Sequence, residues 1–414
     1  MSEEKENYKA RRQALAESLP PGTLAIIPAA REKIRNGDAH YRFRQSSDFY
    51  YLTGFTEPDA VLCVSASKCC ESILFLRPKN PEAECWTGPR LGVEEALTVL
   101  AVDEALPIDT LKARLPELML DKKSIYYPMG QDMGYEAMFR EAWQQATQIA
   151  RRSHQAPEVF ADITPFLSEL RLFKDTYEID CLKDAARLSV TAHEQVMRHA
   201  KSAQNEYELE AEFLYALAKQ GCREVAYEPI VAGGARACTL HYTENNKPLA
   251  PNDLLLVDAG GELCHYAADI TRTYPVSGRF TPEQRDLYQL VLQAQTAGIQ
   301  AVKPGKPWGG IQVAILDVLE PGLKSLGILK NNIDIKTFYM HLSGHWLGLD
   351  VHDVGAYTKE NASRLLEPNM VLTVEPGVYI PKDCDLVDER WCGIGIRIED
   401  DILVTASGHE NLTV

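Results

Sequence analysis

The feature that most constrains this chain is a set of acidic residues at the ends of short apolar segments. Residues 254–257 form an apolar run that would be buried on both faces as a strand, and Asp258 follows it directly. Residues 371–374 lead in the same way into Glu375. Burying a carboxylate is costly unless a cation or hydrogen bonds compensate for it. Acids in these positions therefore indicate an ion-binding site or buried ion pairs.

A second aspartate belongs with Asp258. The chain reverses around Leu263 and Cys264 and returns through Asp269. A hairpin centred midway would place the two aspartates opposite each other, where cross-strand neighbours lie about 5 Å apart and carboxylates repel. The alternative is that one of the acids pairs with Arg272 or caps a turn.

The fourth acid is identified by the alternation of side chains between the two faces of the strand predicted over residues 394–404. The isoleucines at alternate positions face one side, so Arg397 and Glu399 share the other. For this strand alone, a solvated face with an Arg–Glu ion pair would explain the same pattern.

Histidine is concentrated in one Gly-containing stretch, where His341, His345 and His352 fall within 12 residues. A lone histidine there is more often a core or surface residue than a ligand, but three beside four such acids favour a site. A set of four carboxylates and one imidazole has no thiolate, which argues against a structural zinc site. It suits Mn²⁺, Co²⁺, Fe²⁺ or Zn²⁺ in a two-metal arrangement, whose charge the four carboxylates would neutralise.

Composition and charge exclude several classes of protein. The chain has 414 residues and a net charge of −16, which gives no reason to expect a nucleic-acid partner. No apolar run approaches the roughly 20 residues needed to span a bilayer, and no signal peptide is recognisable. The ten cysteines form no C-x-x-C pair and are expected to be reduced, mostly buried thiols. We expect a cytoplasmic protein without nucleic-acid or membrane partners.

Several common enzyme motifs are incomplete or absent in this sequence. His193 and Glu194 begin an H-E-x-x-H pattern, but its fifth position is Met197. The glycines at 393 and 395 lack the third glycine of a dinucleotide-binding loop, and no G-x-S-x-G sequence occurs.

The length suggests two or three domains of about 150 residues. Short strand-like and helical segments alternate in the first part, which predicts an α/β domain over 1–173. Asp175 and Glu178 form a capping box that opens a long helix through His199, so the second domain is predicted over 174–414. Its helices and recurring strands indicate an α+β fold with an antiparallel sheet.

Three more helices are predicted in the second domain. They run over residues 206–219, from an N-cap at Thr281 to just before Pro304, and over residues 311–326. Pro321 is expected to kink or interrupt the last of them.

Together the motifs resemble those of the pita-bread metallopeptidases, and within them the proline-specific aminopeptidase P (Xaa-Pro aminopeptidase) family. The segments that carry this resemblance are 257–260, 269–273, 345–352, 375–379 and 395–399. Residues 35–38 and 41–55 are similar to the N-terminal signature of that family, which methionine aminopeptidases lack.

The resemblance implies an α/β N-terminal domain that serves oligomerisation and supports the substrate site. It implies an α+β pita-bread (creatinase/aminopeptidase-like) catalytic domain that binds two divalent metal ions, with manganese favoured. One metal would be held by Asp269, His345, Glu375 and Glu399, and the other by Asp258, Asp269 and Glu399.

The resemblance also implies roles for individual residues. A hydroxide between the metals would be the nucleophile, Glu375 would take its proton, and His352 would steady the scissile carbonyl. His241 and His341 would surround the substrate proline. Further substrate-binding or supporting positions are Tyr227, Tyr379, Arg397, Asp38 and Trp86, the last from a neighbouring subunit.

The implied activity is release of the N-terminal residue from peptides with proline in the second position, by a homodimer or homotetramer. Prolidase, which has the same metals but cuts only X-Pro dipeptides, is the alternative. A binding module without activity, or metal-free chemistry as in creatinase, is a third possibility, against which the retention of all five ligands argues.

Overall fold

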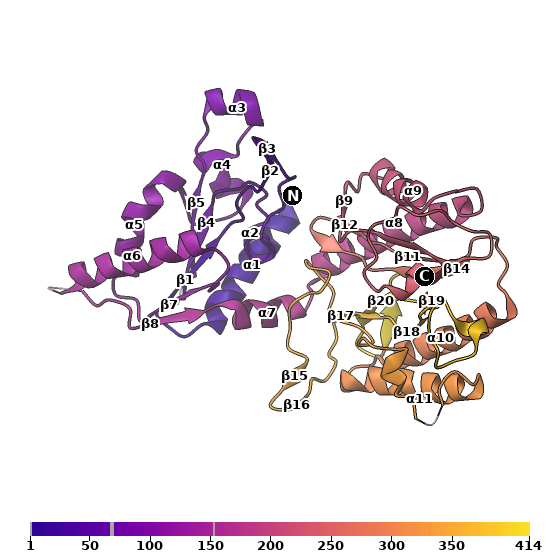
Figure 1. Cartoon of the computed structure of the whole chain (residues 1–414). Coiled ribbons are helices and arrows are strands. Elements are labelled where there is room, and N and C mark those ends of the chain that lie inside the picture. The colour runs from indigo at the N-terminus through magenta and orange to yellow at the C-terminus, as the bar shows by residue number, and fades with distance from the viewer. Residues whose placement is uncertain (1, 67–69, 152–153, 331) are drawn as a thin grey trace. The chain divides into compact units, whose positions relative to one another are not determined.

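The computed structural model describes residues 2–66, 70–151, 154–330 and 332–414 (Figure 1). Within it the chain divides into two compact units, Met1–Arg171 and Leu172–Val414. The sequence-based boundary between residues 173 and 174 lies two residues beyond this division.

A six-stranded mixed sheet forms the centre of the first unit, in the order β6-β5-β4-β1-β7-β8. Its strands are β1 (Thr23–Pro28), β4 (Val61–Ala66), β5 (Glu71–Leu76), β6 (Glu104–Pro107), β7 (Ser124–Tyr127) and β8 (Val159–Asp162). β1, β4 and β5 pair antiparallel, whereas β6, β7 and β8 join the sheet in parallel. The first unit is thus α/β, as predicted.

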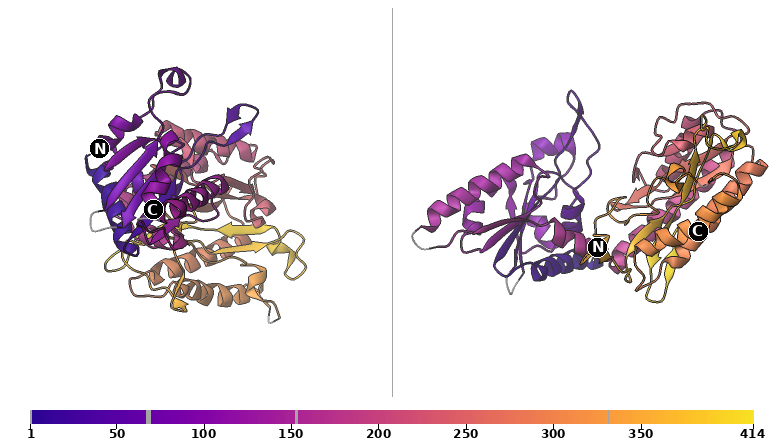
Figure 2. Two further views of the ribbon diagram at one scale, coloured as in Figure 1. Left: turned by 90° about the vertical axis from the view of Figure 1, so that its left-hand side faces the viewer. Right: turned by 60° about the horizontal axis from the view of Figure 1, so that its bottom comes forward.

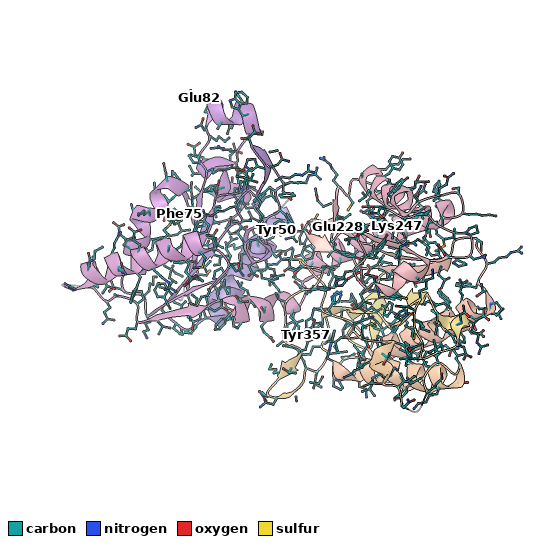
Figure 3. The ribbon with its side chains drawn as sticks, in the orientation of Figure 1. Tyr50, Phe75, Glu82, Glu228, Lys247 and Tyr357 are labelled. Atoms are coloured by element: carbon teal, nitrogen blue, oxygen red, sulfur yellow. The ribbon has the colours of Figure 1, made fainter. Side chains whose placement is uncertain are left out.

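Helices cover this sheet on both faces. The unit's helices are α1 (Ser2–Ser18), α2 (Ser47–Thr53), α3 (Pro81–Thr87), α4 (Gly92–Val99), α5 (Leu111–Met119), α6 (Met133–Ala150) and α7 (Thr164–Leu172), the last ending at the division between the units. Leu115 of α5 and Phe139 of α6 pack with Ile26 and Phe75 of the sheet. Figure 3 labels Phe75 among the side chains of this unit. α1 and α2 lie on the opposite side, and α1 contacts β4 (Figure 1). A short exposed hairpin, β2 (Ile34–Asn36) with β3 (Ala39–His40), precedes α2.

Two helix pairs enclose the second unit. α8 (Thr176–His199) packs with α9 (Glu206–Lys219), and α10 (Pro282–Ala301) lies beside α11 (Gly309–Ser325) (Figure 2). The capping boxes predicted at Asp175 and Thr281 are both formed. α11 continues through Pro321, so an interruption there is wrong. Leu319 and Leu323 on either side are fully buried, and this packing holds the last turn in place.

The strands of the second unit form small antiparallel sheets between the helix pairs. The first contains β10 (Ile230–Gly233), β11 (Leu254–Asp258) and β14 (Thr271–Pro275). Two more contain β17 (Val371–Val374), β20 (Asp400–Val404) and β21 (His409–Asn411), and β18 (Gly377–Ile380) with β19 (Ile394–Arg397). Short strands make two further sheets: β9 (Glu224–Val225), β12 (Gly261–Leu263) and β13 (Tyr266–Ala267), and β15 (Thr358–Lys359) with β16 (Ala362–Ser363). α8 and α9 cover the first sheet, while α10 and α11 pack on β17 to β20. This is the predicted α+β architecture.

One predicted strand is divided. The segment 394–404 is β19 and β20, because its first half pairs with β18 and its second half with β17. Glu399 lies in the gap and bridges to Thr271 of β14. The change of partner places Glu399 between two sheets rather than on the face of one.

The hairpin after Asp258 also differs in register from the prediction. Asp258 pairs with Thr271 rather than with Asp269, because the intervening hairpin turns at Cys264 and His265, both at positive φ. A shift of two residues keeps the side chains on the same face of the sheet. Asp269 therefore still lies beside Asp258.

Two expectations from composition concern the state of the cysteines and the presence of membrane-spanning segments. The nine described cysteines are all free, but only Cys63, Cys181 and Cys222 are buried, so the expectation that most are buried is wrong for them. Cys69 lies outside the described residues. Among those residues, no helix has the length and apolarity needed to cross a membrane.

Candidate metal centre

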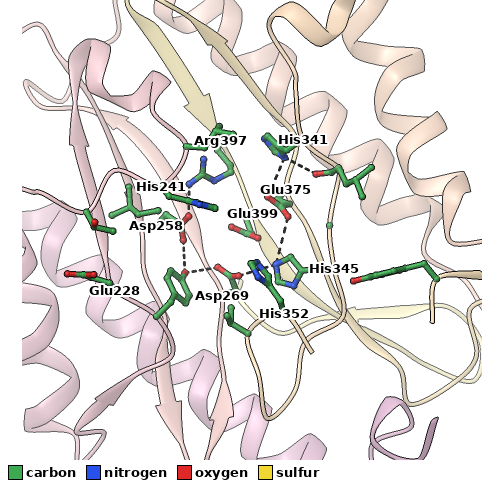
Figure 4. A pocket seen from close by; sticks show the side chains of 18 residues that line it. Glu228, His241, Asp258, Asp269, His341, His345, His352, Glu375, Arg397 and Glu399 are labelled. Carbon is green, nitrogen blue, oxygen red and sulfur yellow. Dashed lines mark hydrogen bonds and ion pairs between the residues drawn. The ribbon is translucent and has the colours of Figure 1, made fainter. Parts of the chain in front are cut away.

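Five acidic and imidazole side chains from distant parts of the second unit line one pocket of about 550 Å³ (Figure 4). They are the predicted ligands Asp258, Asp269, His345, Glu375 and Glu399. The cavity is of the size that small-ligand sites commonly have.

Backbone hydrogen bonds fix His345 beside Glu375. The stretch that precedes His345 runs along β17: the N–H of Thr373 donates to the carbonyl of His345, and that of Glu375 to Ser343, each at 2.9 Å. A Cβ at Gly344 would lie 2.1 Å from the carbonyl oxygen of Thr373. This close approach requires glycine, and it leaves Nε2 of His345 3.8 Å from Oε1 of Glu375.

The bridge between Thr271 of β14 and Glu399 brings Glu399 to Asp269. The N–H of Glu399 donates to the carbonyl of Thr271 at 3.1 Å, and the hydroxyl of Thr271 donates to Oε2 of Glu399 at 2.7 Å. One ligand atom each from Asp269, His345 and Glu399 lies within 4.8 Å of the others, a spacing that suits a shared cation.

Tyr227 joins the remaining carboxylates. Its hydroxyl lies 2.5 Å from Oδ1 of Asp258 and 2.6 Å from Oδ1 of Asp269. A phenol has a single proton and can donate to only one of them. The other carboxylate must carry a proton or be neutralised by a cation, which fits a metal site.

His345 is held in the tautomer that a metal ligand needs. Its Nδ1 lies 2.9 Å from the carbonyl oxygen of Trp346, which can only accept, so Nδ1 carries the proton. Nε2 faces Oδ2 of Asp269 at 3.3 Å. A hydrogen bond of this kind from the second ring nitrogen is typical of ligating histidines.

The carboxylates are short of compensating positive charge. Burial, together with the neighbouring acids, raises the pKa of Glu399 well above its ordinary value. Burial raises the pKa of Glu375 to about 8, although His345 and Arg397 oppose the shift. The pKa of Asp258 is raised by burial despite its contact with Arg397. Two divalent cations would remove this cost, so the donor set fits them.

A hydrogen-bonded chain supports the rim of the pocket. Arg397 donates from Nη1 to the hydroxyl of Tyr379 at 2.9 Å, and that hydroxyl lies 2.8 Å from Nε2 of His341. Nδ1 of His341 donates to the carbonyl of Leu342, so Nε2 accepts from Tyr379. Burial and the charge of Arg397 lower the pKa of His341 to about 4, which keeps it neutral.

The remaining predicted pocket histidines also reach the cavity. His241 and His352 line it, and the ring of His352 packs edge-on against His345 with 4.4 Å between centroids. Burial, and the positive charge that His345 carries when it is protonated, lower the pKa of His352. Tyr227, His341 and Arg397 line the same pocket, and Tyr379 lies directly behind it.

Two predicted site residues belong to the first unit. Asp38 is exposed in the turn between β2 and β3, and Trp86 in α3 is 90% exposed. Their roles in the site stay predictions.

Several residues of the site were not predicted. Thr271 binds both Glu399 and Arg397, and Asp401 accepts the N–H of Asp269 at 3.1 Å. The period of two offered a signal for both, since Thr271 follows Asp269 and Asp401 follows Glu399 at that interval. Glu228 and Tyr357 also line the pocket, but nothing in the sequence distinguished them.

Comparisons with known proteins agree with this geometry. The family described as "Metallopeptidase family M24" matches residues 180–406, and "Aminopeptidase P, N-terminal domain" matches residues 8–126. Xaa-Pro aminopeptidase of Escherichia coli is 41% identical over 99% of this chain and 94% of its own length.

Two solved structures are also similar to this chain over nearly its whole length. Proline aminopeptidase P II from Yersinia pestis superposes with a TM-score of 0.94 at 44% identity, covering 99% of this chain and 96% of the other. Aminopeptidase P from E. coli with the inhibitor Pro-Leu gives a TM-score of 0.95 at 40% identity over 99% and 95% of the two chains. The chain belongs to metallopeptidase family M24, in the group that carries the aminopeptidase P N-terminal domain. The predicted pita-bread fold and metallopeptidase class are confirmed.

Proposed function

We propose that this chain is an aminopeptidase that releases the N-terminal residue from peptides with proline in the second position. The observation that carries the proposal is the convergence of five donor side chains in one pocket of a chain similar over its whole length to Xaa-Pro aminopeptidases. Prolidase is not favoured, because the relatives reported above are named as aminopeptidases and not as dipeptidases.

We further propose that Asp258, Asp269, His345, Glu375 and Glu399 hold two divalent cations, preferably manganese. When bound, these ions would polarise the scissile carbonyl and acidify a water molecule that attacks it. A donor set of four carboxylates and one imidazole suits manganese without excluding its neighbours in the series.

Glu375 is the proposed proton carrier. Its carboxylate lines the pocket, 3.6 Å from Nδ1 of His341 and 3.8 Å from Nε2 of His345. It would accept the proton of the attacking water and pass it to the nitrogen of the leaving proline.

Three histidines are proposed to bind the substrate around the scissile bond. His352 would donate to the carbonyl oxygen and to the charge that develops on it. His241 and His341 would enclose the proline ring, with His341 fixed through Tyr379 and Arg397.

We also propose a cytoplasmic location and assembly as a homodimer or homotetramer through the N-terminal domain. Large apolar side chains exposed in that unit support the assembly, among them Trp86 and Met133 at 90% and 72% exposure. Asp38 is proposed to support the site, and Trp86 that of a neighbouring subunit.

The test is release of the first amino acid from an X-Pro-Y tripeptide with added Mn²⁺, compared with X-Ala-Y and with an X-Pro dipeptide. We expect cleavage of X-Pro-Y alone, and its loss in Glu375→Gln. Glu320→Gln removes an exposed carboxylate of α11 and serves as the control. Equal rates on X-Pro-Y and X-Ala-Y, or no turnover with any divalent metal, would contradict the proposal.

A further inference from the structure

One acidic side chain in the pocket takes no part in the metal centre. Glu228 lines the cavity, and it is exposed, whereas Asp258, Asp269 and Glu399 are buried (Figure 4). Those three carboxylates are engaged by Tyr227, Arg397, His345 or Thr271. Among the described residues, no hydrogen bond or ion pair is made by the carboxylate of Glu228. Its charge is therefore available to a bound substrate.

The backbone around Glu228 is fixed on both sides. Tyr227, which precedes it, is anchored to Asp258 and Asp269 through its hydroxyl. On the other side, the amide of Asn245 donates to the carbonyl of Pro229 at 2.8 Å and accepts the N–H of Val231 at 2.9 Å. The position of Glu228 at the wall of the pocket is thus set by buried contacts, although its own side chain is exposed.

The position of Glu228 relative to the metal centre indicates which part of the substrate would contact Glu228. Figure 4 shows Glu228 on the far side of Asp258 from His341 and His345. Under the proposed function His341, on the side away from Glu228, encloses the proline, whereas His241 lies beside Asp258 (Figure 4). The first residue of the peptide then lies at the Asp258 side, and its side chain extends toward Glu228.

The chemistry of this wall suits a long cationic side chain. Ile230 and Leu240 line the same pocket and offer apolar surface for an aliphatic stem. Lys and Arg carry their charge at the end of such a stem, where it can meet a carboxylate. The guanidinium of Arg397, which also lines the pocket, is already paired with Asp258.

We propose that Glu228 is a specificity-determining residue that favours substrates with Lys or Arg as the first residue. The inference rests on the proposed function, because it concerns the residue that the enzyme would release. Glu228 touches the substrate side chain and not the reacting atoms, so it acts through binding.

The test compares Lys-Pro-Y with norleucine-Pro-Y, which has a similar stem without the charge. We expect the native chain to prefer the Lys peptide by about fivefold or more in kcat/KM, mainly through a lower KM. The reason is that an ion pair in a cleft is stronger than a fully exposed ion pair. The preference should weaken with added salt. It should vanish in Glu228→Gln through a higher KM for the Lys peptide alone.

Glu244→Gln is the matched control. Glu244 is an exposed acid next to Thr243 of the pocket wall, but it does not line the cavity itself. This variant removes the same charge nearby and should keep the preference for Lys. Because Glu228 is exposed, its replacement should leave the unfolding temperature unchanged.

Three results would overturn the inference. The first is equal cleavage of both peptides by the native chain, and the second is a preference for the Lys peptide that persists in Glu228→Gln. The third is slower cleavage of both peptides alike by Glu228→Gln, which would mean that Glu228 binds the terminal ammonium group of the substrate. If neither peptide is cleaved, the proposed function fails. Calorimetric binding of Lys-Pro and norleucine-Pro to the native chain and to Glu228→Gln then decides the inference separately: tighter binding of Lys-Pro only in the native chain supports it, and equal binding overturns it.

Discussion

Arg397 donates from Nη2 to Oδ2 of Asp258 at 2.5 Å, although 139 residues separate them in the sequence. Their side chains are only 4% and 10% exposed. The same guanidinium also binds Tyr379 and Thr271. A single side chain thus orients a proposed ligand and ties β11, β14, β18 and β19 together around the pocket.

Arg397→Lys should lower kcat/KM for an X-Pro-Y peptide by about 10- to 100-fold, the usual effect of losing a residue that orients a metal ligand. Lysine keeps the charge, but its three N–H donors sit on one nitrogen, which cannot reach the three acceptors that the planar guanidinium contacts from Nε, Nη1 and Nη2. Steady-state kinetics and metal affinity of the two proteins check this. Arg390→Lys, which changes an exposed arginine, is the control. Activity within twofold of the native chain would contradict the role assigned to Arg397.

His193 should make the fold sensitive to acid. It is buried on α8, its Nε2 donates to the carbonyl of Ala259, and its Nδ1 has no partner among the described residues. Burial lowers its pKa to about 4, below the ordinary 6.5. The unfolded chain therefore takes up a proton first as pH falls below 6.5, and the folded state loses stability down to pH 4.

The loss attributable to His193 should be about 2 kcal/mol at pH 5 relative to neutral pH. In His193→Gln, which can still donate to Ala259, the unfolding free energy should fall less between pH 7 and pH 5. Chemical denaturation at several pH values measures the difference, with the half-exposed His199→Gln as control. Parallel pH profiles for the native chain and His193→Gln would show that His193 does not contribute.

Lys174 and Asp353 form a buried ion pair at 2.9 Å, and each side chain is 1% exposed. Lys174→Met should cost about 3–5 kcal/mol of stability, because it leaves the carboxylate of Asp353 buried without this cation. Adding Asp353→Leu to it should recover part of the loss. Chemical denaturation of the single and double variants checks this.

Lys183→Met is the matched control for Lys174→Met. Lys183 pairs with Glu410 in an exposed ion pair, so its loss should cost at most about 1 kcal/mol. Equal destabilisation by the two lysine variants would show that burial of the Lys174–Asp353 pair has no special effect.

The sequence predicted the elements that depend on local signals. The caps at Asp175 and Thr281 and the apolar strands before Asp258 and Glu375 were all identified, since each depends on neighbouring residues. The second-unit residues proposed for the site all lie in or directly behind one pocket. Their convergence depended on the resemblance, because no local pattern brings Asp258 and Glu399 together.

Features set by tertiary partners could not be predicted. The division of residues 394–404 arises from a change of pairing partner, and the register at Asp258 from a turn at two residues with positive φ. The continuity of α11 at Pro321 depends on burial of the residues on either side. Glu228 could not be recognised in the sequence, because its proposed role depends on the pocket that it lines and not on its neighbours along the chain.

The metal content of the purified chain tests the account most directly. Elemental analysis of protein prepared without chelator should find two divalent ions per chain, and fewer than one in Asp269→Asn with Glu399→Gln, the two positions proposed to bridge both ions. Glu320→Gln should keep the native content. An empty native chain, or the same metal content after both bridging carboxylates are removed, would contradict the central claim.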